Sequence, residues 1–547
     1  MVCGVERGRW AWALWALLAA CASSGGEPAG PAPETLVQPT RADGEAPQGG
    51  EVADAVDAQA RPKLDGEIVY FVMLDRFADG DEKNNFDVKK GDKGAYQGGD
   101  LAGLTQKLDY LAELGVTTVW ITPIVDQVDM PVTGAGFPDW AYHGYWGDDF
   151  EKLDRHLGDE AALQTLLDEA HKRGLKVMLD VVINHAGYRS RWAIKKEWTR
   201  SLEHKGCPED AVATELDRCL FGLPDFRTED RLVAETVLGW GMGWVRRFPF
   251  DGFRFDTLKH AEAPLFAQLR REGAALAKSQ HGREGFWALG EWWGSAPGDD
   301  TSAALVESGT VDALFDFGFH GVAEGFVSGR MRAEAVGHHL EAREGSGGGP
   351  WVHFLDTHDV PTFLSRLSPE QRGRYPLAAV MQMTSGGIPL VTWGNELGRE
   401  GGEWPLNRSF MPWERLQSEE GRAWHKVWKE LIALRKQEPA LRGTGMEVLW
   451  AKSAASSEGA SLVYRRGEAT ERLKPGGSSF LVVLARGAGE PVEVSLPTPA
   501  SGRLSLEPAF VYGGAWAWER AESGGKVSLR GAPPVDSASV WRVSVVP

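Results

Sequence analysis

Short apolar runs alternate with amphipathic stretches from residue 67 onward. Eight runs are rich in β-branched and aromatic residues and indicate buried strands: EIVYFVML, VTTVWITP, LKVMLDVVIN, FDGFRFD, FWALGEWW, VDALFDF, WVHFLDTHD and GIPLVTWGN. Most are separated by stretches with helical periodicity, such as LAGLTQKLDYLAELG and AALQTLLDEAHKRG. Eight strand-then-helix units predict an α/β fold, a parallel (β/α)8 TIM barrel.

Two intervals between the predicted strands are too long for one strand-helix unit. They cover residues 124–146 and 186 to about 232, and we expect both to be excursions on the catalytic face. After about residue 446 the helical pattern stops, and the runs SLVYRR, SFLVVLAR, VEVSLP, KVSLRG and SVWRVSVV predict an antiparallel β-sandwich. We therefore expect a barrel over 65–445, with a subdomain inserted at about 186–232, and a sandwich domain over 446–547.

The first residues have the pattern of a processing signal. Arg7 and Arg9 precede the apolar run WAWALWALLAA, which is too short to span a bilayer. LAAC, which ends at Cys21, resembles the lipobox of bacterial lipoproteins, whose cysteine is lipidated; a plain signal peptide is the alternative. Residues 22–64 are rich in Ala, Gly, Pro and acidic residues, which predicts a flexible tether. We expect residues 1–21 to direct export and to provide the lipid anchor to the cell envelope. Without lipidation, the protein is expected to be periplasmic or secreted.

Net charge and cysteine content bear on the possible partners and on disulfide formation. A net charge of −18 and the lack of a long basic tract disfavour nucleic acid as a partner, because nothing would offset repulsion from phosphates. Cys207 and Cys219 lie in one irregular segment. An oxidising compartment favours a disulfide between them, and a reduced pair is the alternative.

Polar residues gather where the predicted strands end. Arg254 and Asp256 are two residues apart on the fourth strand, so their side chains leave the same face. We expect the cation to lower the pKa of Asp256; a purely structural ion pair is the alternative. Glu291 ends the fifth strand and Asp359 follows the seventh.

In such a barrel the chemistry lies at the carboxyl ends of the strands, so the three acids are expected to share one pocket. Their mutual repulsion should raise the pKa of at least one of them. A protonated carboxyl beside an ionised one is the arrangement that glycoside hydrolysis requires. A divalent cation bound by the acids is the alternative, and Arg254 argues against it because it would compete with the metal.

Four motifs, in order along the chain, resemble the conserved regions of the α-amylase family of glycoside hydrolases: DVVINH, GFRFDTLKH, GEWW and FLDTHD. The resemblance implies a retaining hydrolase with Asp256 as nucleophile, Glu291 as general acid and base, and Asp359 supporting the transition state. It also implies roles in substrate binding for Asp180, His185, Arg254, Lys259, His260 and His358. Thr357 departs from the asparagine that usually precedes the His-Asp pair.

A further segment, AYHGYW, resembles the family's sugar-stacking loop. The resemblance implies that Tyr145 stacks under the sugar at the cleavage site, that His143 bonds a hydroxyl and that Trp146 lines the next subsite. A loop that fills its own core is the alternative. GLPDF, residues 222–226, resembles the family's fifth region but has Phe226 and Arg227 in place of its usual ending, which leaves the subfamily open.

Oxygen-bearing side chains in DGDEKNN suit calcium, and a solvated Asx turn is the alternative. The resemblance to cyclodextrin-forming members implies a structural Ca²⁺ site completed from the later YQGGD, with the following set: Asp79, Asp81, Asn84, Asn85, Gly98 and Asp100. It also implies a second calcium shared by Asn184, Asp225 and the backbone of His260.

The function that the resemblance implies is hydrolysis of α-1,4-glucosidic bonds in starch, maltodextrins or related α-glucans. Cyclomaltodextrinase-like or neopullulanase-like hydrolysis, or α-glucan transfer, is the first alternative. A surface glucan-binding protein without catalysis is the remote one, and the intact trio of acids argues against it.

Overall fold

The computed structural model describes residues 62–133, 136–209, 213–345, 351–443, 445–455 and 458–547. The predicted signal peptide, Cys21 and nearly all of the predicted tether lie outside these ranges. None of the helices within them has the length and apolar character that a membrane crossing needs.

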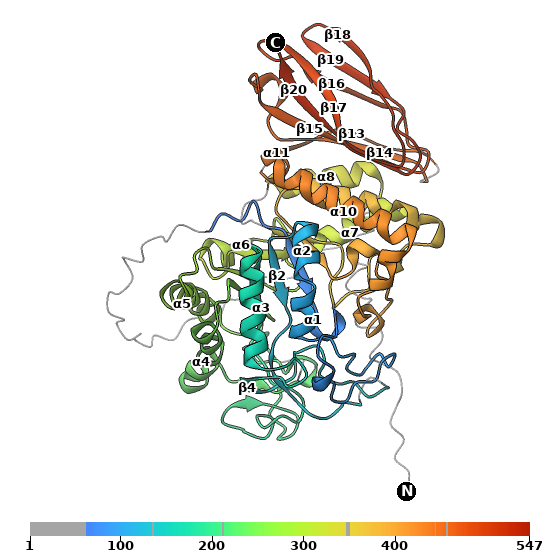
Figure 1. The fold of residues 1–547 in the computed structure, drawn as a ribbon. Coiled ribbons are helices and arrows are strands. Elements are labelled where there is room, and N and C mark those ends of the chain that lie inside the picture. The colour runs from blue at the N-terminus through green and yellow to red at the C-terminus, as the bar shows by residue number, and fades with distance from the viewer. Residues whose placement is uncertain (1–61, 134–135, 210–212, 346–350, 444, 456–457) are drawn as a thin grey trace, which may run out of the picture. The chain divides into compact units, whose positions relative to one another are not determined.

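Eight parallel strands close into a barrel, in the order β1-β12-β11-β10-β9-β8-β5-β2 (Figure 1). Their bounds are β1 Val69–Val72, β2 Thr118–Ile121, β5 Lys176–Val181, β8 Gly252–Phe255, β9 Trp287–Gly290, β10 Ala313–Asp316, β11 Trp351–Phe354 and β12 Ile388–Thr392. Each strand falls within one of the eight predicted runs. The predicted (β/α)8 barrel is therefore confirmed.

Helices follow most of the strands and cover the outside of the barrel. They are α1 Leu101–Gln106, α2 Leu108–Leu114, α3 Glu160–Lys172, α4 Arg231–Arg247, α5 Ala263–His281, α6 Asp300–Glu307, α7 Phe317–Ser328, α8 Ala333–Gly345, α9 Tyr375–Thr384, α10 Glu419–Gln437 and α11 Pro439–Arg442. In α3 the Asp159 side chain accepts a hydrogen bond from the Ala162 amide and caps the helix. The buried side chains of α3 recur every three or four residues, which directs one face toward the barrel.

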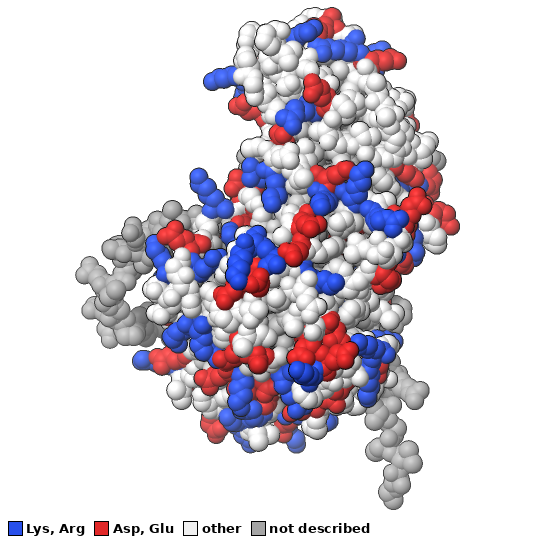
Figure 2. Space-filling view, viewed as in Figure 1, with Lys and Arg blue, Asp and Glu red and all other residues white. Residues whose placement is uncertain are grey.

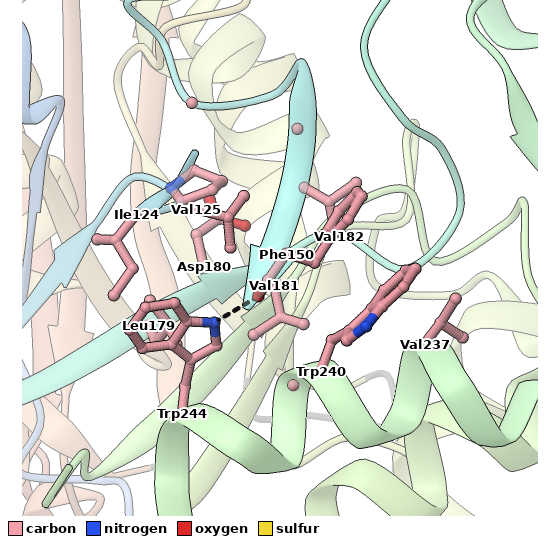
Figure 3. A pocket seen from close by; sticks show the side chains of 14 residues that line it. Ile124, Val125, Phe150, Leu179, Asp180, Val181, Val182, Val237, Trp240 and Trp244 are labelled. Atoms are coloured by element: carbon pink, nitrogen blue, oxygen red, sulfur yellow. Dashed lines mark hydrogen bonds between the residues drawn. The ribbon is translucent and has the colours of Figure 1, made fainter. Parts of the chain in front are cut away.

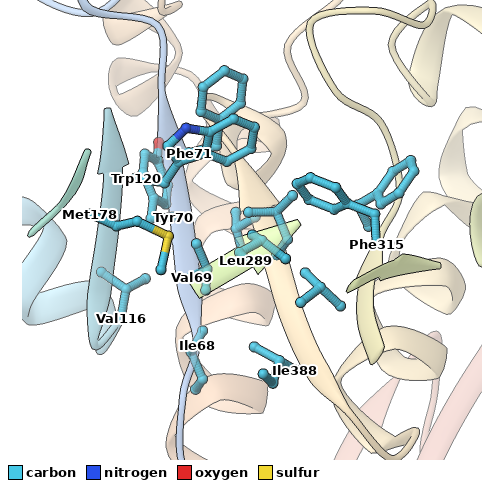
Figure 4. Packing of buried hydrophobic residues seen from close by; sticks show 14 of the residues in the cluster. Ile68, Val69, Tyr70, Phe71, Val116, Trp120, Met178, Leu289, Phe315 and Ile388 are labelled. Atoms are coloured by element: carbon cyan, nitrogen blue, oxygen red, sulfur yellow. The ribbon is translucent and has the colours of Figure 1, made fainter. Parts of the chain in front are cut away.

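Aromatic and branched side chains fill the barrel (Figure 4). Phe71 of β1 stacks on Trp120 of β2, with ring centroids 3.7 Å apart, and Trp120 also contacts the ring of Phe315 from β10. The His358 ring lies 5.0 Å from that of Phe71. These rings form an apolar floor beneath the carboxyl ends of the strands.

The two long intervals form irregular excursions. The first contains β3 Val125–Gln127, which pairs with β4 Gly147–Leu153 directly after the interval. The second contains the short strands β6 Thr199–Arg200 and β7 Asp225–Phe226 and a disulfide between Cys207 and Cys219.

The C-terminal region consists of two antiparallel sheets, as the alternating pattern predicts. One contains β13 Met446–Ser453, β14 Ala460–Arg466, β15 Ser478–Arg486, β20 Ser537–Val546 and β17 Arg503–Tyr512; the other contains β16 Val492–Pro497, β19 Lys526–Gly531 and β18 Glu519–Ser523. Apolar residues from both sheets share a core of their own. β13, β17 and β18 were not among the runs that the sequence pattern singled out.

Acidic and basic side chains are interspersed on the face shown in Figure 2. No continuous basic patch is present among the described residues on that face.

Asp251 precedes β8 and ties together elements at the amino-terminal end of the barrel. Its side chain is 2% exposed. It accepts a hydrogen bond from the Val177 amide of β5 at 2.8 Å, contacts His171 Nε2 of α3 at 2.8 Å and accepts one from Arg283 Nε at 2.7 Å. In barrels of this kind, polar residues at this end serve stability and not chemistry.

Asp251→Ala should therefore destabilise the fold. It leaves the buried Val177 amide and the Arg283 guanidinium without their acceptor, which should lower the free energy of unfolding by about 3 kcal/mol. Urea denaturation measures this. Asp168→Ala is the matched control, because it removes the same charge from an exposed position of α3 and should change stability by less than about 0.5 kcal/mol. Equal midpoints for the two variants would rule out a structural role for Asp251.

Candidate active site

The predicted acids lie together at the carboxyl ends of the barrel strands. Asp256 directly follows β8, Glu291 directly follows β9, and Asp359 lies on the loop after β11. Because all eight strands are parallel, these positions share one edge of the barrel.

Arg254 joins carboxylates from three strands. It lies in β8 and its side chain is 1% exposed. Its Nη1 atom is 2.6 Å from Asp256 Oδ1 and 3.0 Å from Asp180 Oδ1. Its Nη2 atom is 3.6 Å from Glu291 Oε2. A planar, permanently charged guanidinium can hold several carboxylates in fixed directions at once.

Asp180, at the end of β5, anchors the groups around it. Its Oδ2 atom accepts hydrogen bonds from the Tyr145 hydroxyl at 2.8 Å and from Trp120 Nε1 at 3.0 Å, in addition to its contact with Arg254. Its side chain is fully buried. Although the resemblance implied a substrate contact, the structure gives Asp180 the geometry of a residue that positions Arg254 and Tyr145.

Glu291 is set apart from the other acids by its surroundings. Burial raises the pKa of Glu291 to about 8, with Arg254 opposing this and the charges of Asp256 and Asp359 adding to it. The expected increase is therefore present, but burial is its largest cause and mutual repulsion a smaller one. The Glu291 carboxyl is consequently protonated at neutral pH.

Thr257 was missed by the sequence analysis. Its amide donates a hydrogen bond to Glu291 Oε2 at 2.8 Å. Its φ angle is +47°, in the left-handed region that β-branched residues rarely adopt. This strained conformation follows Asp256 directly and turns the amide toward the acid of the neighbouring strand.

Asp359 is the most open of the three acids, with 34% of its side chain exposed. Its carboxylate contacts Arg408 Nη2 at 3.4 Å and His358 Nε2 at 3.3 Å. Arg408 also donates to the His358 carbonyl at 3.0 Å. The Thr357 hydroxyl accepts a hydrogen bond from the Asp359 amide at 3.2 Å. Arg408 was also missed by the sequence analysis, because no motif surrounds it.

The aromatic segment after β2 packs onto the floor of the site. The Tyr145 ring stacks on His358 with centroids 5.1 Å apart, and His143 Nδ1 accepts a hydrogen bond from the Tyr145 amide. His185 Nε2 lies 3.2 Å from the Tyr145 carbonyl. Burial lowers the pKa of His143 and of His185, so both rings are neutral at pH 7. Trp146 meets the Tyr188 ring edge-on.

Lys259 and His260 lie on the opposite side of the acids, just beyond Asp256. The Lys259 ammonium is 5.1 Å from the centre of the Trp292 ring. His260 Nδ1 lies 2.8 Å from the carbonyl of Glu215, which belongs to the excursion after β5. That excursion therefore reaches this side of the site.

Unpartnered oxygens mark the first candidate calcium loop. Asp79 Oδ1, Asn84 Oδ1 and Asn85 Oδ1 are buried and have no hydrogen-bond partner within the described chain. Gly98 has φ +94°, and a Cβ atom there would lie 2.5 Å from Asn85 Oδ1, so only glycine fits. These donors fit a hard cation that prefers oxygen ligands.

The two other acids of the predicted calcium set have structural partners. The Asp100 carboxylate accepts hydrogen bonds from the amides of Gly80, Asp81 and Gly103, and it caps α1. The Asp81 side chain accepts a hydrogen bond from the Lys83 amide. Considering only His, Cys, Asp and Glu, no group of three or more within the described ranges could hold a metal ion.

At the second candidate calcium site, the orientation of the Asn184 amide decides between hydrogen bonding and a set of metal ligands. The Asn184 amide faces Asp225 Oδ1 and the His260 carbonyl. With its nitrogen toward them it donates hydrogen bonds to both, and with its oxygen toward them three oxygens meet. Arg200 pairs with the other Asp225 oxygen at 3.0 Å. Burial raises the pKa of Asp225 to about 8.

An apolar cavity lies between β5 and α4, on the outside of the barrel wall (Figure 3). Its lining includes Phe150, Leu179, Trp240 and Trp244, and Trp244 donates a hydrogen bond to the Phe150 carbonyl at 3.0 Å. Of the three acids and Arg254, none lines it. Asp180 also borders this cavity, whose other walls come mainly from the apolar packing between β5 and α4.

Comparisons with known proteins point to one family. A family model described as "Alpha amylase, catalytic domain" matches residues 71–205. The periplasmic α-amylase of Escherichia coli K12 is 27% identical over 69% of this chain and 68% of its own length. A cyclomaltodextrinase of Geobacillus thermopakistaniensis is 28% identical over 75% of this chain and 66% of its own length. The chain thus spans about two thirds of these relatives.

Solved structures agree. An Anoxybacillus α-amylase has a TM-score of 0.72 and 27% identity, covering 89% of this chain and 99% of its own. The α-amylase of Geobacillus thermoleovorans, solved with acarbose, has a TM-score of 0.69 and 26% identity, covering 88% of this chain and 99% of its own. The barrel, the arrangement of acids and these likenesses together support a glycoside hydrolase of the α-amylase type.

Proposed function

We propose that this chain is a retaining hydrolase of α-1,4-glucosidic bonds in starch, maltodextrins or related glucans. One observation carries the proposal: a single buried guanidinium contacts both Asp256 and Glu291, while the pKa of Glu291 is raised to about 8. The site thus contains an acid that can donate a proton beside a carboxylate held in an ion pair. The relative solved with acarbose supports an α-glucan as the substrate class.

The proposed mechanism has two steps. Glu291 protonates the glycosidic oxygen as the leaving sugar departs, while Asp256 attacks the anomeric carbon and forms a glycosyl-enzyme. Glu291, now ionised, takes a proton from water, and that water displaces Asp256 with retention of configuration. In this mechanism Asp359, which contacts Arg408 and is 34% exposed, bonds hydroxyls of the distorted sugar.

An exposed aromatic residue favours cyclodextrin hydrolysis or glucan transfer as the second candidate function. Phe221 is 83% exposed and has φ +53°. Its carbonyl accepts a hydrogen bond from Tyr188, whose ring packs against Trp146. A flat ring presented at this point can stack on an acceptor sugar and compete with water. Chromatography of products from soluble starch, cyclodextrin and pullulan separates the two functions.

We further propose that calcium stabilises the fold at the loop of Asp79, Asn84, Asn85 and Gly98. The unpartnered oxygens there support this, because buried oxygens without hydrogen bonds are costly unless a cation or water binds them. A second ion at Asn184 is the extension of the same proposal, and the number of calcium ions bound per chain distinguishes the two.

Export and lipid anchoring through Cys21 complete the proposal. The periplasmic location in the name of one relative supports export. The lipobox-like LAAC supports the anchor.

The division of labour between the acids gives the first prediction here. Glu291→Gln should lose about 10² to 10⁴ in rate on natural glucans, and far less in the glycosylation step on an activated aryl glycoside, whose leaving group needs no proton. Asp256→Asn should be inactive on both. Glu235→Gln, the same change at an exposed position of α4, is the control. A labelled glycosyl-enzyme on another residue, or a β-anomer as first product by NMR, would refute the mechanism.

Calcium should raise the melting temperature. A ligand that binds only the native state stabilises it by mass action, so a chelator should lower the melting temperature and added calcium should restore it. Asp79→Ala should abolish this response. Glu82→Ala removes an exposed carboxylate from the same loop and should keep it. An Asp79→Ala protein that responds like the parent would eliminate this site.

Cys21→Ser should move the protein from the membrane fraction to a soluble fraction, because the lipid supplies the anchor. Fractionation with immunoblotting measures this. Cys3→Ser, which changes a cysteine outside the lipobox, should leave the protein membrane-bound. Retention of the Cys21→Ser protein in membranes would contradict lipid anchoring at this residue.

A further inference from the structure

Two aromatic side chains that the mechanism does not use lie together on the catalytic side of the barrel. Trp404, on the loop after β12, is 41% exposed. Its ring centroid is 5.2 Å from that of Phe137, at an interplanar angle of 38°. Phe137 belongs to the excursion after β2, which also carries the Tyr145 segment. We refer to Trp404 and Phe137 as the aromatic pair.

Contacts with neighbouring backbone restrain both members of the pair. Gly94 lies directly against Phe137, because a Cβ atom there would be 2.7 Å from the ring. On the other loop, the Thr362 amide donates to the Gly401 carbonyl and the Gly401 amide donates to the Thr362 hydroxyl, each at 2.9 Å. This ties the Trp404 loop to the segment just after Asp359. A fixed, partly exposed ring is suited to binding because little conformational freedom is lost.

The pair shares its two loops with residues of the candidate active site. Trp404 lies four residues before Arg408, whose guanidinium contacts Asp359, and both residues are on the same loop. Phe137 lies six residues before His143, which packs beside Tyr145. The pair is therefore carried by the same two loops as Arg408 and His143, at the carboxyl ends of the strands.

The order of strands shows which end of the substrate reaches the pair. β12 and β2, whose loops carry Trp404 and Phe137, are the two neighbours of β1. In the closed barrel β1 is directly opposite β9, the strand of Glu291. Glu291 protonates the leaving group, so the leaving sugars lie on its side, together with Lys259 and His260. The sugars that remain attached to Asp256 extend to the opposite side.

We propose that the aromatic pair is a binding subsite for α-glucan sugars remote from the cleaved bond, on the side retained by the enzyme. The inference rests on the proposed function and deepens it. The flat apolar face of a glucose ring stacks on Trp404, with Phe137 behind it. Leu406, 50% exposed on the same loop, extends the apolar surface. The subsite favours long glucans over short ones, because only a long chain reaches it.

The test varies the retained end of the substrate alone. Aryl α-glycosides from maltose to maltoheptaose share one leaving group, and release of nitrophenol from their p-nitrophenyl forms gives kcat/KM for each length. Trp404→Ala should lower kcat/KM roughly 3- to 10-fold for the long substrates, the size of one aromatic contact, and leave the shortest unchanged. Trp404→Phe should retain most of the preference for length, and Phe137→Ala should weaken it.

Trp293→Ala is the matched control. Trp293 is 45% exposed and follows Glu291 on the loop after β9, across the barrel from the pair. Its loss should affect all lengths equally. An equal loss at every length in Trp404→Ala, or no loss, would overturn the subsite. The subsite would also be overturned if Trp404→Ala kept the length profile of the wild type but changed the sedimentation coefficient. That result would assign the pair to contact with another protein molecule.

A binding measurement separates this inference from the proposed function. In the Asp256→Asn background, calorimetry should show that Trp404→Ala weakens maltoheptaose binding and leaves maltotriose binding unchanged. If the wild type binds these sugars in this way but does not cleave them, the proposed function fails and the subsite stands. If it cleaves them and Trp404→Ala binds both sugars like its parent, the subsite fails and the function stands.

Discussion

The candidate site depends on one buried cation shared among three strands. Arg254 of β8 contacts Asp180 in the neighbouring strand β5, Asp256 directly after β8, and Glu291 directly after β9. Removing carboxylates from water is unfavourable, and a buried positive charge at hydrogen-bond distance is what offsets it. Because the strands are hydrogen-bonded in fixed register, with Arg254 paired to Asp180 and to Leu289, the charges cannot separate without breaking the barrel.

The two central acids differ in how closely they contact the guanidinium, and this difference gives them different chemistry. Glu291 is 3.6 Å from the guanidinium and burial dominates its pKa, whereas Asp256 is in direct contact at 2.6 Å. The strained Thr257 backbone adds a hydrogen bond to Glu291 and sets its direction. The aromatic floor of Phe71 and Trp120 keeps water from beneath these groups, so electrostatic contacts there are stronger than they would be in water.

Much of the fold followed from the sequence pattern, and part of the site did not. All eight barrel strands lie within predicted runs, because short β-branched segments between helical repeats have few alternatives. Thr257, Trp120 and Arg408 were missed. Trp120 was assigned only as part of a strand, yet its indole reaches Asp180, 60 residues away. Arg408 reaches Asp359 from 49 residues away. Contacts of this kind depend on which strands become neighbours, and no local pattern carries that information.

The run FPFDGFRFD shows where the sequence by itself ends and tertiary structure begins. The pattern alone determined a buried strand with polar residues at both ends, and it determined that Arg254 and Asp256 share a face, because side chains alternate along a strand. It could not distinguish the roles of Asp251 and Asp256, which are the same residue type five positions apart. The direction of the strand in the closed barrel decided this. Asp251 lies at the amino-terminal end among backbone amides and Arg283, where it stabilises the fold, and Asp256 lies at the carboxyl end, where loops from several strands meet and leave room for a substrate.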